Sequence, residues 1–430
     1  MEVKNMKRNI FISIIIVSLC LAMLMPALSF SQEKLRKEGR YYIADIEKTY
    51  DVKKGGNLVM EKIRGDVVIT TWDKNVVQIH EIRKMDVYTE AEAKAVLKES
   101  DALYQKTDNT IKVGGEDNYR SYMSSKFEVV LPAEFNVDIG TSGGDISVTE
   151  LKGKVDLKTS GGDIDLIRID GIVTAKTSGG DVTVSENKQS VAIKTSGGDV
   201  KISDVMGEVD AITSGGDITV ENNRAKVSVK TSGGDIELKN IGAEVDAHTS
   251  GGDITVDGTN GALEVSTSGG DIDLKNIKDV INAKTSGGDI EAMNVLNGIY
   301  AATSGGDVDL DDIRGFVEAK TSGGDVEAKI TLKDFSKDHH VNMKSSGGSL
   351  TLYIPEKLPA TITAVINIRG ASWQDYDISS DFPLTSKKES EEANSGRREE
   401  IIRSEGKING GGDLINLETT NGNISIKKLK

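Results

Sequence analysis

The sequence predicts an all-β protein built as a parallel β-helix, or β-solenoid, with right-handed coils of 18 residues and one short helix in an N-terminal cap. The first observation behind this prediction is a repeat: TSGGD occurs eleven times at a constant interval of 18 residues, from Thr141 to Thr321. The second is an alternation of apolar and polar residues after each copy. A fixed period indicates units that bury their apolar faces by stacking on one another.

The unit 159–176, TSGGDIDLIRIDGIVTAK, shows the alternation in IDLI and again in VTAK. A period of two is that of a β-strand, so each unit contains two strands. The glycines and Asp between them are turn residues. We expect structural turns at the paired glycines, of which the first are Gly143, Gly144, Gly161, Gly162, Gly179 and Gly180.

Stacking places matching residues of successive units in columns, because parallel strands lie about 4.8 Å apart. Eleven coils would make a rod roughly 50 Å long. Two columns are apolar throughout and predict the core: Ile146, Ile164, Val182, Val200, Ile218, Ile236, Ile254, Ile272, Ile290, Val308 and Val326; and Val155, Val173, Val191, Val209, Val227, Val245, Leu263, Ile281, Ile299 and Val317.

A third column changes character, because Asn187, Asn223 and Thr259 alternate with apolar residues. This weaker period of 36 residues has two interpretations. Either pairs of coils were duplicated, or a full turn contains 36 residues and four strands.

The segment 1–31 has the order of a secretory signal peptide: basic residues, an apolar run over 10–25, then small residues after Pro26, with cleavage after Ser29 or Ser31. An uncleaved membrane anchor is the alternative, since the run approaches the ~20 residues of a spanning helix. Either way we expect export to the periplasm, the outer cell surface or the extracellular medium. Membrane contact would then occur only through an uncleaved signal segment.

Cys20, the only cysteine, would be acylated in a lipoprotein, but the large Leu19 before it argues against that alternative. Losing Cys20 with the signal leaves no disulfide. Removing the signal, which carries a net +2, also takes the formal charge from −15 to −17. An acidic chain with 4% aromatic residues is a poor partner for nucleic acid.

We divide the remaining chain into an N-terminal β cap (32–140), the TSGGD solenoid (141–344) and C-terminal coils with a cap (345–430). In the N-terminal cap, Thr89 and Glu92 form a capping box that begins a predicted helix at 89–104, which we expect to cover the open edge of the first coil. The predicted strands at 57–63, 66–72 and 76–82 resemble coils whose repeat has been lost. Other predicted features are strands at 350–353 and 360–368, two coil-like strands within 414–426, and a polar, solvated or disordered loop at 386–404.

Arg64-Gly65-Asp66 spells a tripeptide that some adhesins present to integrins. Because Gly65-Asp66-Val67 matches the Gly-Asp-apolar turn of the later coils, the repeat explains it without a receptor.

The SGGDI and SGGDV turns, together with the segments 56–73 and 410–426, resemble the bacterial adhesin-like family of unknown function and the head-GIN adhesin-like domains. The resemblance covers nearly all of the chain after the signal. It implies a parallel β-helix at the cell envelope and brings no catalytic residues with it.

A motif repeated in register is a poor active site, because catalysis needs one asymmetric constellation. We therefore expect a non-catalytic rod that has no cofactor. We expect this rod to bind a surface polymer, a glycan or a protein. A polysaccharide-processing enzyme is the alternative, with room for a site only around 330–340 and 372–381. The histidines His80, His248, His339 and His340 lack zinc-site spacing, and we expect the adjacent pair in a solvated loop.

A calcium-dependent surface protein is a further alternative, because the aspartates of the repeat would stack as a column of carboxylates. These aspartates directly follow the glycine pair, and this spacing differs from that of the calcium-binding nonapeptide. We favour their accepting turn N–H groups, helped by Lys158, Lys176, Lys194, Lys230, Lys284 and Lys320. The candidate calcium ligands begin with Asp145, Asp163, Asp181, Asp199, Asp217 and Asp235.

Overall fold

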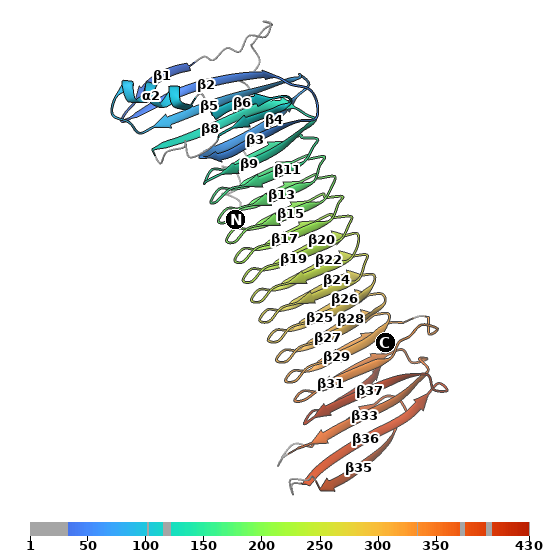
Figure 1. The fold of residues 1–430 in the computed structure, drawn as a ribbon. Helices are drawn as coiled ribbons and strands as arrows, with labels where there is room; N and C mark the ends of the chain where they lie inside the picture. Colours follow the sequence, from blue (N-terminus) through green and yellow to red (C-terminus); the bar gives the residue numbers. More distant parts are fainter. Residues whose placement is uncertain are drawn as a thin grey trace.

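The protein is a long straight rod of stacked coils with a wider region at each end (Figure 1). The computed structural model describes residues 33–100, 103–114, 122–332, 334–369, 375–392 and 398–429. The predicted signal peptide, 1–31, lies outside the described residues. None of the helices within these ranges is both long and apolar enough to cross a membrane.

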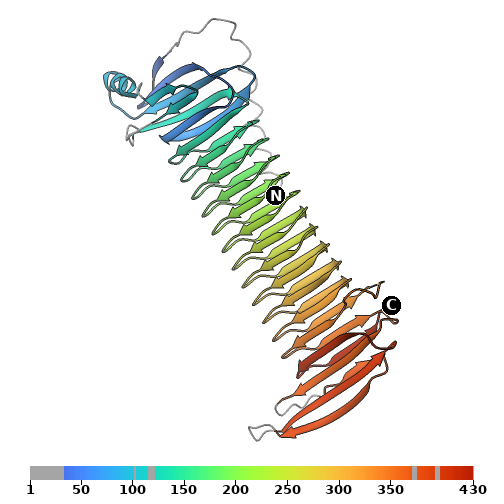
Figure 2. The ribbon, with the colours of Figure 1, turned by 45° about the vertical axis from the view of Figure 1, so that its right-hand side comes forward.

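One coil of the rod contains 18 residues and two strands. β12 (Ile164–Ile167) pairs in parallel with β10 (Ile146–Thr149), and Ile146 lies opposite Ile164. The same offset recurs along the rod, whose regular spacing is visible in Figure 2. The 18-residue solenoid is thus confirmed, and the interpretation of a 36-residue turn with four strands is wrong.

The strands form two sheets, here called sheet A and sheet B, and each coil contributes one strand to each. In order of pairing, sheet A contains β1 (Glu33–Glu38), β2 (Tyr41–Asp51), β5 (Val76–Met85), β8 (Met123–Pro132), β4 (Gly65–Trp72), β10, β12, β14 (Val182–Ser185), β16 (Val200–Ser203), β18 (Ile218–Glu221), β20 (Ile236–Ile241), β22 (Ile254–Thr259), β24 (Ile272–Ile277), β26 (Ile290–Val295), β28 (Val308–Ile313), β30 (Val326–Ile330), β32 (Leu350–Ile354), β38 (Ile424–Lys428) and β34 (Ile378–Ser380).

Sheet B likewise contains β6 (Tyr104–Thr107), β7 (Thr110–Val113), β3 (Gly56–Ile63), β9 (Phe135–Thr141), β11 (Val155–Lys158), β13 (Val173–Lys176), β15 (Val191–Lys194), β17 (Val209–Ile212), β19 (Val227–Lys230), β21 (Val245–His248), β23 (Leu263–Ser266), β25 (Val280–Lys284), β27 (Gly298–Ala302), β29 (Phe316–Lys320), β31 (Val341–Ser345), β37 (Asp413–Thr420), β33 (Ala360–Ile368), β36 (Arg398–Ile408) and β35 (Thr385–Glu392).

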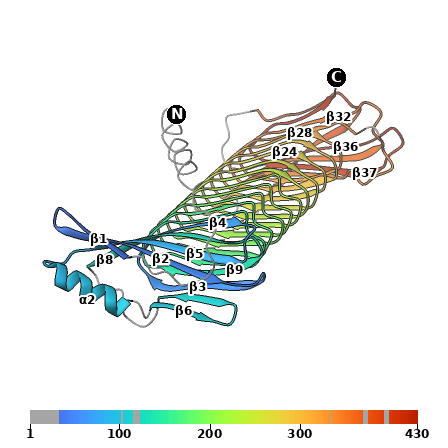
Figure 3. The same cartoon turned by 90° about the horizontal axis from the view of Figure 1, so that it is seen from above.

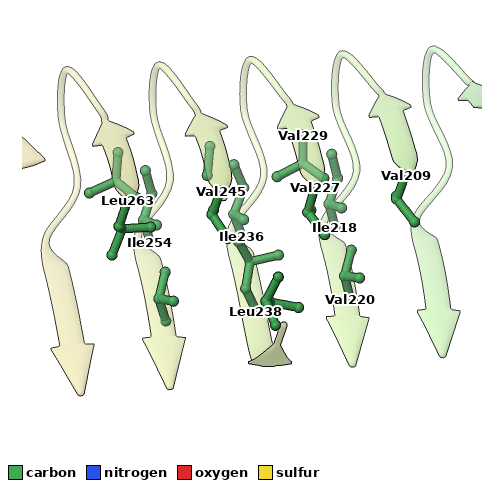
Figure 4. Close-up of a cluster of buried hydrophobic side chains, with 14 of the residues drawn as sticks. Val209, Ile218, Val220, Val227, Val229, Ile236, Leu238, Val245, Ile254 and Leu263 are labelled. Carbon is green, nitrogen blue, oxygen red and sulfur yellow. The ribbon is translucent and has the colours of Figure 1, made fainter. Parts of the chain in front are cut away.

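The core is the layer of apolar side chains between the two sheets. Figure 4 shows Ile236 and Ile254 of sheet A beside Val245 and Leu263 of sheet B, and all four are buried. Both predicted apolar columns are buried throughout. Burial of each Val, Ile or Leu contributes about 1.5–3 kcal/mol, so the stack is held mainly by contacts between neighbouring coils.

The third column is also interior and lies at the turn that leads from sheet A to sheet B. Its polar members bond the turn backbone: Nδ2 of Asn187 donates to the Gln189 carbonyl at 2.6 Å, and Oδ1 of Asn223 accepts the N–H of Ala225 at 2.8 Å. The period of 36 is therefore an alternation of side chains in one column, not a longer coil.

The N-terminal end adds antiparallel strands to the stack. β3 and β4 form one more coil, because they pair in parallel with β9 and β10, as the sequence predicts. β5 departs from the expected coil pattern, since it pairs antiparallel with β2 and β8. Alternation alone does not distinguish parallel from antiparallel partners.

The helix of the cap, α2 (Glu90–Ser100), begins where the capping box predicts and ends earlier than expected (Figure 3). The N–H of Glu92 donates to Oγ1 of Thr89 at 3.2 Å, and the N–H of Thr89 donates back to the Glu92 carboxylate at 3.3 Å. Ala93 and Leu97 pack in a cluster with residues of β2 and β5. The expectation that the helix covers the edge of the first coil is wrong, because β8 and β7 pair with that coil instead.

Glu81 and Arg83 form an ion pair in this cap, and both side chains are fully buried. Nε and Nη2 of Arg83 each donate to the Glu81 carboxylate at 2.7 Å. The hydroxyls of Tyr104 and Ser125 also donate to it. Bidentate geometry with added donors is what a charge pair needs to be tolerated away from water.

At the C-terminal end, the coils do not stack in chain order. β37 and β38 pair with β31 and β32 on one side and with β33 and β34 on the other. The last coil in the sequence therefore lies between two coils that precede it.

The described residues of the polar segment 386–404 lie in strands and not in a loop, which corrects the sequence prediction; residues 393–397 lie outside the described residues. β35 and β36 form an antiparallel hairpin, and β36 continues the sheet from β33. Lys387, Lys388 and Glu389 are exposed on β35, the last strand of sheet B. Charged residues are common on edge strands because they discourage pairing with other chains. The high polarity of this strand therefore made its sequence resemble that of a loop.

Candidate functional site

The TSGGD turn is organised by its threonine and its second glycine. Oγ1 of Thr159 donates to the carbonyl of Gly144 in the preceding coil at 2.9 Å and accepts the N–H of Gly162 at 3.3 Å. A Cβ on Gly162 would lie 2.1 Å from the Gly144 oxygen, whereas one on Gly161 would meet nothing within 4 Å. The turn therefore requires its second glycine, and Ser, the first glycine and Asp remain exposed along the rod.

The aspartates form a continuous ladder. Oδ1 of Asp145 accepts the backbone N–H of Asp163 in the next coil at 2.9 Å. The sequence hypothesis that these carboxylates accept turn N–H groups thus agrees with the structure, with the donor one coil further along. The same contact joins Asp163, Asp181, Asp199, Asp217, Asp235 and Asp253 in turn.

The tripeptide Arg64-Gly65-Asp66 occupies the equivalent turn of the first coil. Oδ1 of Asp66 accepts the N–H of Asp145 at 3.1 Å, and Oγ1 of Thr141 donates to the Gly65 carbonyl at 2.9 Å. Both contacts are those of the later repeats, which supports the repeat interpretation of this motif.

The lysines expected to assist the Asp ladder do not contact it. Lys158 pairs with Asp156 on its own strand at 3.2 Å, and none of the six lysines named above pairs with a ladder aspartate within the described ranges. They lie at the outward ends of the sheet B strands, where their charges are solvated.

No three His, Cys, Asp or Glu side chains gather as metal ligands among the residues described. His80 lies beside Asp45 and Glu128, and His248 contacts Asp246 and Ser266. The hypotheses of a calcium site and a zinc site are therefore not supported by any cluster of ligands among the described residues.

Residues 334–340 fold against the rod, so the expectation of a solvated loop is wrong for His339. Its side chain is buried and its ring lies near Phe335, while its backbone N–H donates to Asp413 at 3.0 Å. A hollow of about 480 Å³ beside this segment is lined in part by Asp312, Arg314 and Thr331. Of the other region proposed for an enzyme site, 372–381, residues 372–374 lie outside the described residues.

An aromatic group interrupts the repeat on the outer face of sheet B. The rings of Tyr300 and Phe316 lie 4.8 Å apart between centroids, and Phe316 stacks on His340 at 5.2 Å with the planes 1° apart. A Cβ on Gly298 would lie 2.5 Å from the Phe316 ring, so this glycine makes room for the ring to lie across its strand. We call Tyr300, Phe316 and His340 the aromatic platform.

Polar columns run beside the platform. Tyr300 lies between Asn282 and Glu318 in the register of β25, β27 and β29, and the outward column next to it contains Lys284, Ala302, Lys320 and Lys344. The small Ala302 leaves a hollow of about 480 Å³ between the lysines. This is an asymmetric surface that the repeat by itself does not generate.

His340 is held by two carboxylates. Nδ1 contacts Asp338 at 2.8 Å and Nε2 contacts Glu318 at 3.2 Å. Burial acts to lower the pKa of His340, but the hydrogen bonds to Asp338 and Glu318 outweigh it and raise that pKa above 6.5. The pKa of Asp338 is lowered by its hydrogen bond from His340.

The repeat pattern of the sequence does not indicate this surface. The sequence feature that could have indicated this surface is the rarity of aromatic residues in the repeat, since Tyr300 and Phe316 are the only Phe, Tyr or Trp residues between Phe135 and Phe335. Their contact depends on strand register and on Gly298, which sequence alone does not show.

The fold and its repeating turns define a β-solenoid repeat protein. The family model described as Toastrack DUF4097 matches residues 65–261 and 190–297, which together span more than half of the chain. The chain belongs to this family, and the sequence resemblance to an adhesin-like family of unknown function is confirmed.

Two solved structures are similar to the chain at low scores. A candidate adhesin from Bacteroides fragilis is 16% identical, with 72% of this chain and 95% of that chain covered and a TM-score of 0.22. A candidate cell adhesion protein from Clostridium sporogenes is 9% identical, with 89% and 99% covered and a TM-score of 0.14. Scores this low carry no argument about function. Comparison with curated proteins finds no match.

Proposed function

We propose that this protein is a non-catalytic, adhesin-like rod that is exported and binds a polymer, glycan or protein at a bacterial cell surface. The observation that carries the proposal is the ladder of identical turns, which presents exposed Ser and Asp at the same place in every coil. Identical contacts at ~4.8 Å intervals suit a partner that is itself repetitive, because linked weak contacts gain affinity by multivalency.

The test is an array of envelope and plant glycans together with whole bacterial cells, probed with the chain after the expected signal. Retention on at least one glycan or cell type without product release is the expected result. Turnover of any glycan would show an enzyme instead, and no retention anywhere would remove the binding role.

Export is tested separately by expressing the full chain with its first 31 residues. N-terminal sequencing of the exported protein is expected to begin after Ser29 or Ser31. A full-length product in the membrane fraction would identify an uncleaved anchor, and labelling with palmitate at Cys20 would identify a lipoprotein.

A further inference from the structure

We propose that the aromatic platform and the lysines beside it bind a carboxylated polysaccharide, with one sugar ring on Tyr300 and carboxylates at Lys284 and Lys320. This inference rests on the proposed function and deepens it, because it names the class of partner and the place on the rod where the partner is held.

The platform is built rather than accidental. Phe316 fits only because Gly298 has no side chain, and it holds Tyr300 on one side and His340 on the other. His340 is fixed in turn by Asp338 and Glu318. Tyr300 itself is 41% exposed, so a supported ring faces solvent.

Such a ring suits a sugar. One face of a pyranose presents C–H groups, which are attracted to the electron-rich face of an aromatic ring. The hydroxyls around its rim need donors and acceptors, and the amides of Asn282 and Asn342 lie in the same outward column as Tyr300. The interval between coils, ~4.8 Å, is also close to the length of one sugar unit in an extended polysaccharide.

The lysines indicate that the polymer carries carboxylates. Lys284 and Lys320 are exposed on either side of Ala302, about 9.6 Å apart along the rod, and neither forms an ion pair with another described residue. Lys344 differs, since Glu418 holds it at 3.1 Å. The hollow is lined by three lysines and one carboxylate, that of Glu318, so in a chain with a formal charge of −15 it is a local site for anions.

The test measures binding of polygalacturonate and of its fully methyl-esterified form by calorimetry and surface interferometry. Tyr300→Ala is expected to weaken binding of both polymers about tenfold or more, while Tyr300→Phe retains it. The double variant Lys284→Gln/Lys320→Gln is expected to weaken the carboxylated polymer selectively. Lys176→Gln/Lys194→Gln, two changes in the same column far from the platform, serves as the matched control and is expected to bind like the parent.

Equal binding by the parent and Tyr300→Ala, with unchanged melting temperatures, would overturn the inference. Equal binding of the esterified and carboxylated polymers, with no effect of the lysine changes, would overturn the assignment of a carboxylated partner. Cell binding that needs Tyr300 but survives periodate oxidation of the cell-surface sugars would identify a protein partner instead. If the parent binds cells or other glycans but neither polymer, this inference fails while the proposed function stands.

Discussion

The two glycines of each turn have different roles at the scale of single residues. A Cβ at Gly216 would lie 2.0 Å from the Gly198 oxygen, whereas one at Gly215 would lie 3.6 Å from the Ser196 oxygen, an ordinary contact. Gly216→Ala is therefore expected to cost about 1–3 kcal/mol or more, because the coils must separate. Gly215→Ala is the control and is expected to be neutral or slightly stabilising, since alanine restricts the unfolded chain. Thermal unfolding followed by circular dichroism compares them, and equal melting temperatures would contradict the steric argument.

His340 gives a pH dependence that belongs to one side chain. Its folded pKa is raised above 6.5, so its protonated form stabilises the folded state. This contribution is fully present below the unfolded pKa of about 6.5 and is lost as the pH rises through the raised folded value. His340→Gln is expected to destabilise the protein on the acidic side of this window and to approach the parent above it. A difference in melting temperature that stays constant across the window would contradict the role assigned to His340.

At the scale of strands and turns, much of the rod could be predicted from the sequence. The alternation in IDLI and VTAK sets the strands, and the 18-residue interval sets the coil, because identical residues stack only at that offset. The capping box at Thr89 and Glu92 located the start of α2 for a local reason, since both hydrogen bonds lie within four residues.

The remaining elements depend on partners that lie far away in the sequence. The antiparallel pairing of β5 and the order of the C-terminal coils are decided by tertiary contacts, which alternation does not report. The hairpin of β35 and β36 was not predicted because its charged residues are typical of a loop. The aromatic platform was not predicted because it depends on the register of β27 and β29. Local patterns therefore predict the repeat well and the places that break it poorly.

A coil is the unit of deletion. Removing 213–248, two complete coils, joins matching positions and is expected to leave a folded rod shorter by about 9.6 Å. Removing 213–239, one and a half coils, sets a turn against a strand and is expected to destabilise the protein. Small-angle scattering gives the length, and circular dichroism gives the strand content. Unfolding of the two-coil deletion, or equal stability of the two deletion variants, would contradict the assignment of one 18-residue coil as the structural unit.

At the scale of the whole molecule, the two sheets have four edge strands among the described residues, β1 and β34 in sheet A and β6 and β35 in sheet B, which must not pair with other chains. On the edge strand β35, the exposed charges of Lys387, Lys388 and Glu389 oppose pairing with a strand of another chain. Replacing all three with valine is expected to produce end-to-end dimers or larger species in light scattering. Glu237→Val, on a strand inside sheet A, is the control and should remain monodisperse. A triple variant of unchanged mass would show that edge charge does not limit assembly.

The position of β37 and β38 between earlier coils also has a consequence for how the protein matures. Coils of the repeat can form one after another as the chain emerges, since each needs only its predecessor. The far end cannot close in that way, because β33 with its partner β36 joins the stack, and β34 gains its strand partner, only when residues 413–428 enter the gap. Completion of the rod is thus timed by the arrival of residues 413–428, and a nascent molecule that lacks them carries an unfinished end open to a chaperone or protease.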